Sequence, residues 1–154
     1  MKDNIDTDLI YPGKYLPIID SKEMAKHALE GLDRNFPQKI QKGDIIIAGK
    51  NFGCGSSREQ AATSLKHAGI SCVVAKSFSR IFFRNAINQG LALVQSEKAY
   101  DLVEEGKEII IDFEKGEIIL NDKKIEFAHL PDFIKEILDS GGLIPYIKKK
   151  LEQK

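Results

Sequence analysis

The sequence predicts a mixed α/β domain in which helices flank a mostly parallel sheet and an antiparallel β annex follows toward the C-terminus. Two observations support this fold class. Three short apolar runs alternate with helical patterns between residues 44 and 94, and strands separated by helices usually pair in parallel. Residues 107–127 instead alternate apolar and polar positions around Lys115-Gly116 and Asn121-Asp122, which is typical of antiparallel hairpins.

The alternating segment can be assigned element by element. Short runs rich in Ile, Val and Leu predict buried strands at residues 44–49, 70–75 and 91–94. Periodic apolar positions predict helices at residues 58–68 and 78–90. Gly69 and Gly90 close these two patterns and are expected to end the helices. The buried face of the first helix is expected to carry Ala61, Ala62 and Leu65.

The segments on either side are less regular. The first 19 residues are expected to be irregular, because prolines and a glycine interrupt them. A helix is then expected from Asp20 to about Leu32, with Glu23 as a capping partner. Its inward face would carry Met24, Ala28 and Leu29. After the parallel strands, further helices are expected at residues 97–103, 130–142 and 143–153.

Length and charge limit the class of protein. At 154 residues the chain is expected to form a single domain spanning residues 1–154. Its 23 basic and 23 acidic residues cancel, which argues against a nucleic-acid-binding protein. The basic run at residues 148–150 is typical of a solvated helix end. No apolar stretch approaches the roughly 20 residues that cross a bilayer, so no membrane association is expected.

The N-terminal residues and the cysteines bear on the location of the protein. The start MKDNIDTD is acidic and polar, unlike a signal peptide, and we expect a cytoplasmic protein. Cys54 and Cys72 are the only cysteines. Without an export signal, these two thiols are expected to stay reduced rather than to form a disulfide.

The stretch NFGCGSSREQA stands between a predicted buried strand and a predicted helix. Ligands of open α/β sheets bind beyond the carboxyl ends of strands, where helix N-termini offer unpaired N–H groups. Gly53 and Gly55 would let the backbone approach a ligand. The hydroxyls of Ser56 and Ser57 and the guanidinium of Arg58 suit an anion. The alternative is a capped helix with Ser57 as N-cap, which leaves one glycine, one serine and the arginine unexplained.

Several chemistries use an anion site, and known motifs separate them. The glycine patterns of phosphate and dinucleotide sites are absent, because Lys50 precedes the glycines and Arg58 stands where a third glycine belongs. A Ser–His hydrolase is disfavoured, because the histidines are scattered and His67 lies roughly 15 Å along the helix. The helix N-terminus and Arg58 would favour negative charge on Ser56, an environment that suits proton transfer.

Three separate motifs reveal a resemblance to a known family. NFGCGSSREQA, together with DNIDTDLIYPGKYL at residues 3–16 and AKSFSRIFFRNAINQGL at residues 75–91, resembles the small subunit of the isopropylmalate dehydratase and homoaconitase family. The same unit resembles the swivelling C-terminal domain of aconitase. The motifs cover about the first 95 residues, and the remainder fits in length and pattern. The resemblance implies an aconitase-type swivelling fold.

The resemblance also implies an activity and a partner. Family members are hydro-lyases that move a hydroxyl between neighbouring carbons of a hydroxy-acid through an alkene. Their 4Fe–4S cluster, whose open iron acts as a Lewis acid, sits on a separate large subunit. No cofactor or metal is therefore expected on this chain, whose two cysteines cannot supply three thiolates. Cys54 is expected to be a small filler. The implied partners are the large subunit and a hydroxy-dicarboxylate substrate.

Roles for individual residues follow from the same resemblance. Ser56 would be the catalytic base that takes the proton from carbon. Ser57 and Arg58 would bind a substrate carboxylate, with Gly55 giving the backbone room beside them. Asp8 would be catalytic by orienting a histidine of the large subunit, although a turn or an N-cap would also account for the sequence DTD.

The variable end of the substrate is expected to meet Leu16, Pro17 and Ile18. Aconitase-like and homoaconitase-like members place an arginine after the Tyr-Leu pair, whereas no cation follows Leu16 here before Asp20. An unpaired carboxylate would be unfavourable beside this apolar stretch, so an alkyl group is expected and isopropylmalate, of leucine biosynthesis, is preferred. Homoaconitase or another alkyl-malate or citraconate hydro-lyase is the alternative substrate class. An anion-binding regulatory module is the alternative outside enzymes.

Overall fold

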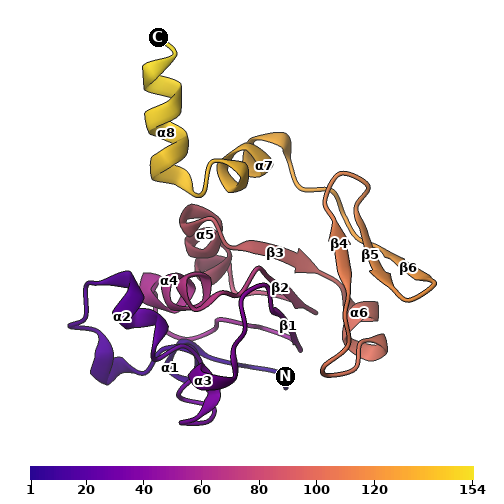
Figure 1. Cartoon of the computed structure of the whole chain (residues 1–154), viewed down its shortest axis with the longest axis horizontal. Coiled ribbons are helices and arrows are strands. Elements are labelled where there is room, and N and C mark those ends of the chain that lie inside the picture. Colours follow the sequence, from indigo (N-terminus) through magenta and orange to yellow (C-terminus); the bar gives the residue numbers. More distant parts are fainter.

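A three-stranded parallel sheet is the centre of the fold, in the order β1 (Ile45–Ala48), β2 (Cys72–Ala75) and β3 (Ala92–Gln95). The computed structural model, which describes residues 1–154, places helices α4 (Glu59–Ala68) and α5 (Arg80–Gln89) in the connections between these strands (Figure 1). The predicted alternation of strands and helices is therefore confirmed.

The helices end and pack as the sequence predicts. Gly69 and Gly90 adopt the left-handed conformation at φ 108° and 78°, and their N–H groups bond to carbonyls of the last helical turn. A side chain at either position would be strained, which is why glycine ends these helices. The predicted inward residues of α4 are fully buried, namely Ala61, Ala62 and Leu65.

Both faces of the sheet are covered. Side chains alternate between the faces, as the two-residue period of a strand requires. Val73 and Ala75 of β2 belong to the main core with residues of α4 and α5. Cys72 and Val74 belong to a second cluster with Ala99 and residues of the antiparallel annex. Burial on both faces explains why the strands are continuously apolar.

The N-terminal segment is more ordered than the sequence predicts. Its first 19 residues, expected to be irregular, contain α1 (Thr7–Ile10) and the 3-10 turn η1 (Gly13–Tyr15). Helices α2 (Ser21–Ala25) and α3 (Phe36–Lys39) follow. Ile5, Ile10 and Tyr11 are buried in the main core. The segment is therefore an integral part of the domain rather than an irregular arm.

The first predicted helix is shorter than expected. Asp20 is its N-cap as predicted, but the helix ends at Ala25 rather than near Leu32. A series of turns follows, in which Leu29 adopts a left-handed conformation at φ 61°. Leu29 is fully buried, and its N–H donates to the carbonyl of Ile10 at 2.7 Å. Burial and this hydrogen bond offset a backbone strain that is rare outside glycine.

The C-terminal part confirms the antiparallel annex. Helix α6 (Glu97–Leu102) leads into three consecutive antiparallel strands, β4 (Ile110–Asp112), β5 (Glu117–Leu120) and β6 (Lys123–Glu126). Two helices complete the chain, α7 (Asp132–Asp139) and α8 (Leu143–Glu152). Helix α8 extends away from the rest of the molecule (Figure 1).

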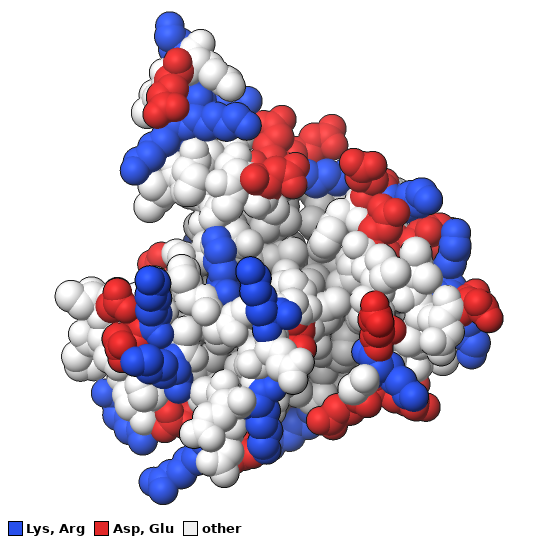
Figure 2. Space-filling model, in the orientation of Figure 1, with Lys and Arg blue, Asp and Glu red and all other residues white.

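Charged side chains of both signs are spread over the surface. Figure 2 shows basic and acidic residues together on one face, in keeping with the formal charge of zero. None of the helices combines the length and the apolar character that crossing a bilayer would need.

Candidate active site at the Ser56 loop

The Ser56 loop, residues 49–58, connects β1 to α4 and is held by backbone hydrogen bonds from both sides. The N–H of Gly53 donates to the carbonyl of Ile5 at 2.8 Å, and the N–H of Thr7 donates to the carbonyl of Cys54 at 2.9 Å. On its other side the loop forms a parallel bridge to the segment before α5. These bonds fix the position of the loop between two distant parts of the chain.

The two glycines of the loop have different roles. Gly53 is buried with φ 78°, and a Cβ there would lie 2.2 Å from the ring of Phe82. Gly53 therefore permits a close approach to α5 and not to a ligand, which corrects the sequence interpretation. Gly55 is exposed with φ 99°, and the nearest atom to a Cβ there is Oγ1 of Thr7 at 3.3 Å. Gly55 is the glycine that lies at the surface beside Ser56.

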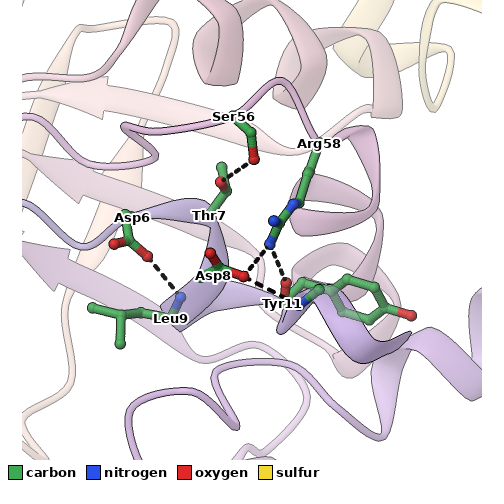
Figure 3. A network of polar contacts seen from close by, with 8 residues as sticks. Asp6, Thr7, Asp8, Leu9, Tyr11, Ser56 and Arg58 are labelled. Atoms are coloured by element: carbon green, nitrogen blue, oxygen red, sulfur yellow. Dashed lines mark hydrogen bonds and ion pairs between the residues drawn. The ribbon is translucent and has the colours of Figure 1, made fainter. Parts of the chain in front are cut away.

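Helix α1 brings Thr7 and Asp8 to the loop (Figure 3). Its N-cap is Asp6, whose carboxylate accepts a hydrogen bond from the N–H of Leu9 at 2.8 Å. Thr7 is buried, and its Oγ1 lies 3.3 Å from Oγ of Ser56, which is exposed. Ser56 is thus exposed to solvent, and the hydroxyl of the buried Thr7 lies next to its own.

Arg58 supplies a positive charge next to the two serines and is paired within the chain. Its Nη1 forms a salt bridge with Oδ1 of Asp8 and donates to the carbonyl of Tyr11 at 3.3 Å (Figure 3). The same Oδ1 accepts from the N–H of Gly13 at 3.1 Å. The hydrogen bond from Arg58 lowers the pKa of the Asp8 carboxyl below its ordinary value. Because both bonds of Arg58 use Nη1, its Nη2 and Nε have no partner in the chain.

Ser57 is not the cap of the following helix, so the capped-helix alternative is wrong. The N-cap of α4 is Arg58, in an extended conformation at φ −117° and ψ 105°, and no side chain caps the helix. Ser56 and Ser57 are both exposed next to this helix end. The first N–H groups of a helix have no intrahelical partner and favour an anion. Hydroxyls, N–H groups and a guanidinium are therefore available together.

The residues expected at the variable end of the substrate start beside Arg58. Turn η1 begins at Gly13, where a Cβ would lie 3.3 Å from Nη2 of Arg58. The apolar loop follows η1 and consists of Leu16, Pro17, Ile18 and Ile19. Leu16 and Pro17 are exposed, whereas Ile18 is half-buried against the core.

Ile19 is a further residue of the apolar loop that the sequence analysis did not select. It is 92% exposed and lines a hollow of about 260 Å³ over α4, together with Met24, Glu59, Gln60, Thr63 and Gln89. Its place in an apolar run next to Ile18 was the available signal. A larger hollow of about 380 Å³ lies away from this region, between the loop after α6 and the β5–β6 turn.

The thiols of the chain are both free. Burial raises the pKa of the Cys54 thiol, and the charge of Asp6 raises it further, so Cys54 stays protonated near neutral pH. Burial also raises the pKa of the Cys72 thiol. No three His, Cys, Asp or Glu side chains are placed to hold a metal ion. The hydroxyl of Ser56 contacts Thr7 and no histidine, in agreement with the exclusion of a Ser–His hydrolase.

Comparison with known proteins identifies the family. The family model described as aconitase C-terminal domain matches residues 1–99. The chain is 51% identical over 153 residues to the 3-isopropylmalate dehydratase small subunit of Caldicellulosiruptor bescii, covering 98% of this chain and 92% of that protein. It is 49% identical over 152 residues to the isopropylmalate/citramalate isomerase small subunit of Methanocaldococcus jannaschii, covering 97% of this chain and 90% of that protein.

A solved structure supports the same assignment. The crystal structure of a 3-isopropylmalate dehydratase from Methanocaldococcus jannaschii matches with a TM-score of 0.92 at 47% identity, over 99% of this chain and 92% of that chain. The predicted aconitase-type fold is thereby confirmed. The chain therefore belongs to the aconitase C-terminal domain family and, within it, to the 3-isopropylmalate dehydratase small subunits.

Proposed function

We propose that this chain is the small subunit of a 3-isopropylmalate dehydratase, which interconverts 2-isopropylmalate and 3-isopropylmalate by dehydration and rehydration in leucine biosynthesis. The observation that carries the proposal is an edge formed by the exposed serines Ser56 and Ser57 and the half-buried Arg58, with Thr7 in contact with Ser56 and Asp8 paired with Arg58. The chain that carries this edge is 51% identical in sequence to a 3-isopropylmalate dehydratase small subunit.

Ser56 is the proposed catalytic base, which takes the proton from the substrate carbon. A serine hydroxyl is a weak base, so its alkoxide has to be stabilised by its surroundings. Oγ1 of Thr7, 3.3 Å away, can donate to Ser56, and the positive end of the α4 dipole lies beside it. Arg58 adds a fixed positive charge two residues further along. Each of these groups favours the charged form of Ser56 over the neutral hydroxyl.

Ser57 and Arg58 are the proposed carboxylate-binding residues, and Gly55 leaves the backbone open beside them. The unpaired Nη2 and Nε of Arg58 can donate in parallel to the two oxygens of a carboxylate. Asp8 keeps the guanidinium oriented through Oδ1. Its Oδ2 accepts no hydrogen bond within the chain, and we assign to that oxygen the orientation of a histidine on the large subunit.

Leu16, Pro17 and Ile18 are proposed to contact the alkyl group of the substrate. A second carboxylate would find no cation among them, which favours isopropylmalate over citrate-like and homoaconitate-like substrates. The relative from Methanocaldococcus jannaschii is named for both isopropylmalate and citramalate, so a smaller alkyl-malate is the second candidate.

The proposed partner is a large subunit that carries a 4Fe–4S cluster. The thiols of this chain do not fit as cluster ligands, because the chain has two cysteines where three thiolates are needed, and Cys72 is buried in the core. When bound on the partner, the cluster supplies a Lewis acid for the substrate hydroxyl. The residues of this chain bind, orient and deprotonate the substrate. Two free thiols suit a reducing compartment, and we place the protein in the cytoplasm.

Reconstitution tests the proposal. The purified chain mixed with its large subunit should isomerise 2- and 3-isopropylmalate, whereas neither chain should do so alone. Ser56→Ala should lower kcat by about 10²–10⁴, the range for losing a general base. Ser71→Ala is the matched control, because Ser71 is also exposed but lies before β2, at the opposite end of the sheet.

Two results would count against the proposal in different ways. An undiminished rate for Ser56→Ala would refute the assignment of the base. A wild-type mixture that is inactive with every alkyl-malate, or that prefers homoaconitate, would refute the proposed function or its substrate.

A further inference from the structure

A compact polar cluster lies directly behind the apolar loop. Tyr15, the residue before the loop, donates its hydroxyl to Oε1 of Glu30 at 2.5 Å. Nδ1 of His27 lies 2.7 Å from Oε2 of the same carboxylate. The imidazole of His27 stacks on the ring of Tyr15, with centroids 3.6 Å apart and planes inclined by 17°. We call these three residues the Glu30 cluster.

The side chains of the Glu30 cluster are partly buried, which limits the partners that the Glu30 carboxylate can have. The side chains of His27 and Glu30 are only 23% and 15% exposed. Burial raises the pKa of the Glu30 carboxyl, but hydrogen bonds from Tyr15 and His27 outweigh it and leave that pKa below its ordinary value. Glu30 is thus ionised near neutral pH and accepts strong hydrogen bonds. Tyr15 and His27 each contact a different oxygen of this carboxylate, so together they favour one geometry, and Nζ of Lys14 lies 3.8 Å from Oε1.

Glu30 is itself fixed against α1. Leu29, which precedes it, donates its N–H to the carbonyl of Ile10 at 2.7 Å. Gly31, which follows it, lies so close to α1 that a Cβ there would be 2.5 Å from the carbonyl oxygen of Asp8. The cluster therefore connects the apolar loop to the helix whose Asp8 side chain holds Arg58.

The backbone at the start of the apolar loop is held by hydrogen bonds, whereas two of its side chains are exposed. The carbonyl of Tyr15 accepts hydrogen bonds from the hydroxyl of Tyr11 at 2.8 Å and from the N–H of Ile18 at 3.0 Å. Leu16 and Ile19, in contrast, are 39% and 92% exposed. Apolar side chains on a fixed backbone can discriminate alkyl groups by length, because a loosely held loop would adapt to any of them.

We propose that Glu30, with Tyr15 and His27, is a positioning residue that sets the distance between the apolar loop and the Arg58 carboxylate site, and so selects among alkyl-malates. This inference rests on the proposed function. The three side chains act through the loop and not on the reacting atoms. Loss of the cluster should therefore weaken the binding of the larger alkyl group while the proton transfer at Ser56 continues.

The first measurement uses amide hydrogen exchange on the isolated chain. Glu30→Gln keeps the shape of the side chain and removes its charge, whereas Tyr15→Phe keeps the ring and removes the hydroxyl. We expect the amides of Leu16 and Ile18, which donate to the carbonyls of Gly13 and Tyr15 in η1, to exchange about tenfold faster in either variant. The matched control is Glu23→Gln, which removes an exposed carboxylate paired with Lys26 at 2.6 Å.

The second measurement uses the complex with the large subunit and two substrates, isopropylmalate and the smaller citramalate. In Glu30→Gln and Tyr15→Phe, KM for isopropylmalate should rise about tenfold, and KM for citramalate by no more than about twofold. The kcat for each substrate should stay within about twofold of the wild type. Glu23→Gln should leave the ratio of the two kcat/KM values unchanged.

The outcomes separate this inference from the proposed function. A kcat/KM ratio that stays at the wild-type value, with or without a common loss of kcat, would overturn the inference, because the cluster would then be only structural. If Glu30→Gln does not fold, the milder Tyr15→Phe decides. A wild-type complex that acts on neither substrate would overturn the proposed function. In that case, amide exchange at the wild-type rate in both Glu30→Gln and Tyr15→Phe would separately overturn the inference about the Glu30 cluster.

Discussion

Replacement of Gly53 by alanine should destabilise the domain through Phe82, although Gly53 contacts no proposed ligand. Alanine in the left-handed conformation at φ 78° costs about 1–2 kcal/mol. Its Cβ would also lie 2.2 Å from Cγ and 2.4 Å from Cβ of Phe82. Phe82 is 2% exposed and packs on Phe52 with ring centroids 5.2 Å apart, so rotating its ring cannot relieve the overlap.

Helix α5 would have to move, and overpacking of this kind costs about 1–3 kcal/mol. Together the two effects predict a loss of about 2–5 kcal/mol in the free energy of unfolding. Gly106→Ala is the matched control, because Gly106 has φ 80° but no atom within 4 Å of a Cβ. Only the backbone cost of about 1–2 kcal/mol should appear there.

Urea unfolding of the isolated chain, followed by circular dichroism, measures both variants. The difference between them isolates the contact with Phe82, because the two glycines have nearly the same φ. Equal losses for Gly53→Ala and Gly106→Ala would refute the packing role and return Gly53 to the candidates for ligand contact.

Three further predictions concern single contacts. Asp8→Asn should lower the free energy of unfolding by no more than about 1 kcal/mol at neutral pH, because the Asp8 side chain is 65% exposed and solvent screens its pair with Arg58. Since the folded pKa of Asp8 is depressed, this difference in stability should persist above about pH 4 and vanish as the pH falls through the folded pKa. Urea unfolding at several pH values measures the difference, and a loss of stability that does not depend on pH would contradict this prediction. Lys66→Met should speed amide exchange in α7 and α8, because Nζ of Lys66 donates to the carbonyl of Gly141 at 2.7 Å; protection equal to the wild type would exclude this anchor. Cys54 should react with iodoacetamide more slowly at pH 7 than cysteine in an unfolded peptide, because its pKa is raised, and an equal rate would be inconsistent with its burial.

Much of the fold could be predicted because local rules determine its elements. Short apolar runs predicted the three parallel strands, and Gly69 and Gly90 marked where the intervening helices end. The length of α2 could not be predicted in this way. Its end depends on Leu29, which adopts a left-handed conformation only because the main core and the carbonyl of Ile10 hold it there.

The candidate site was predictable in its residue types and not in its contacts. Ser56 and Arg58 stood out because hydroxyls and a guanidinium at a strand-to-helix loop suit an anion. The pairing of Arg58 with Asp8 joins residues 50 positions apart, and no local pattern encodes it. Similarly, the burial of Gly53 against Phe82 follows from how α5 packs on the loop.

The Glu30 cluster was missed for a related reason. Tyr15, His27 and Glu30 each look ordinary in the sequence, and their meeting depends on the turns that replace the second half of the predicted helix. Had that helix continued to Leu32, the carboxylate of Glu30 would not occupy this place beside η1. Tertiary contacts, rather than helix propensity, decide the chain path here.

The central claim is that Ser56 supplies the base of an active site that a large subunit completes. The rate of alkene formation from 3-isopropylmalate, followed by its ultraviolet absorbance in the reconstituted complex, tests it most directly. The account predicts that Ser56→Ala lowers kcat for this step by about 10²–10⁴ while KM stays within about twofold. Alkene formation at the wild-type rate by the Ser56→Ala complex would contradict it.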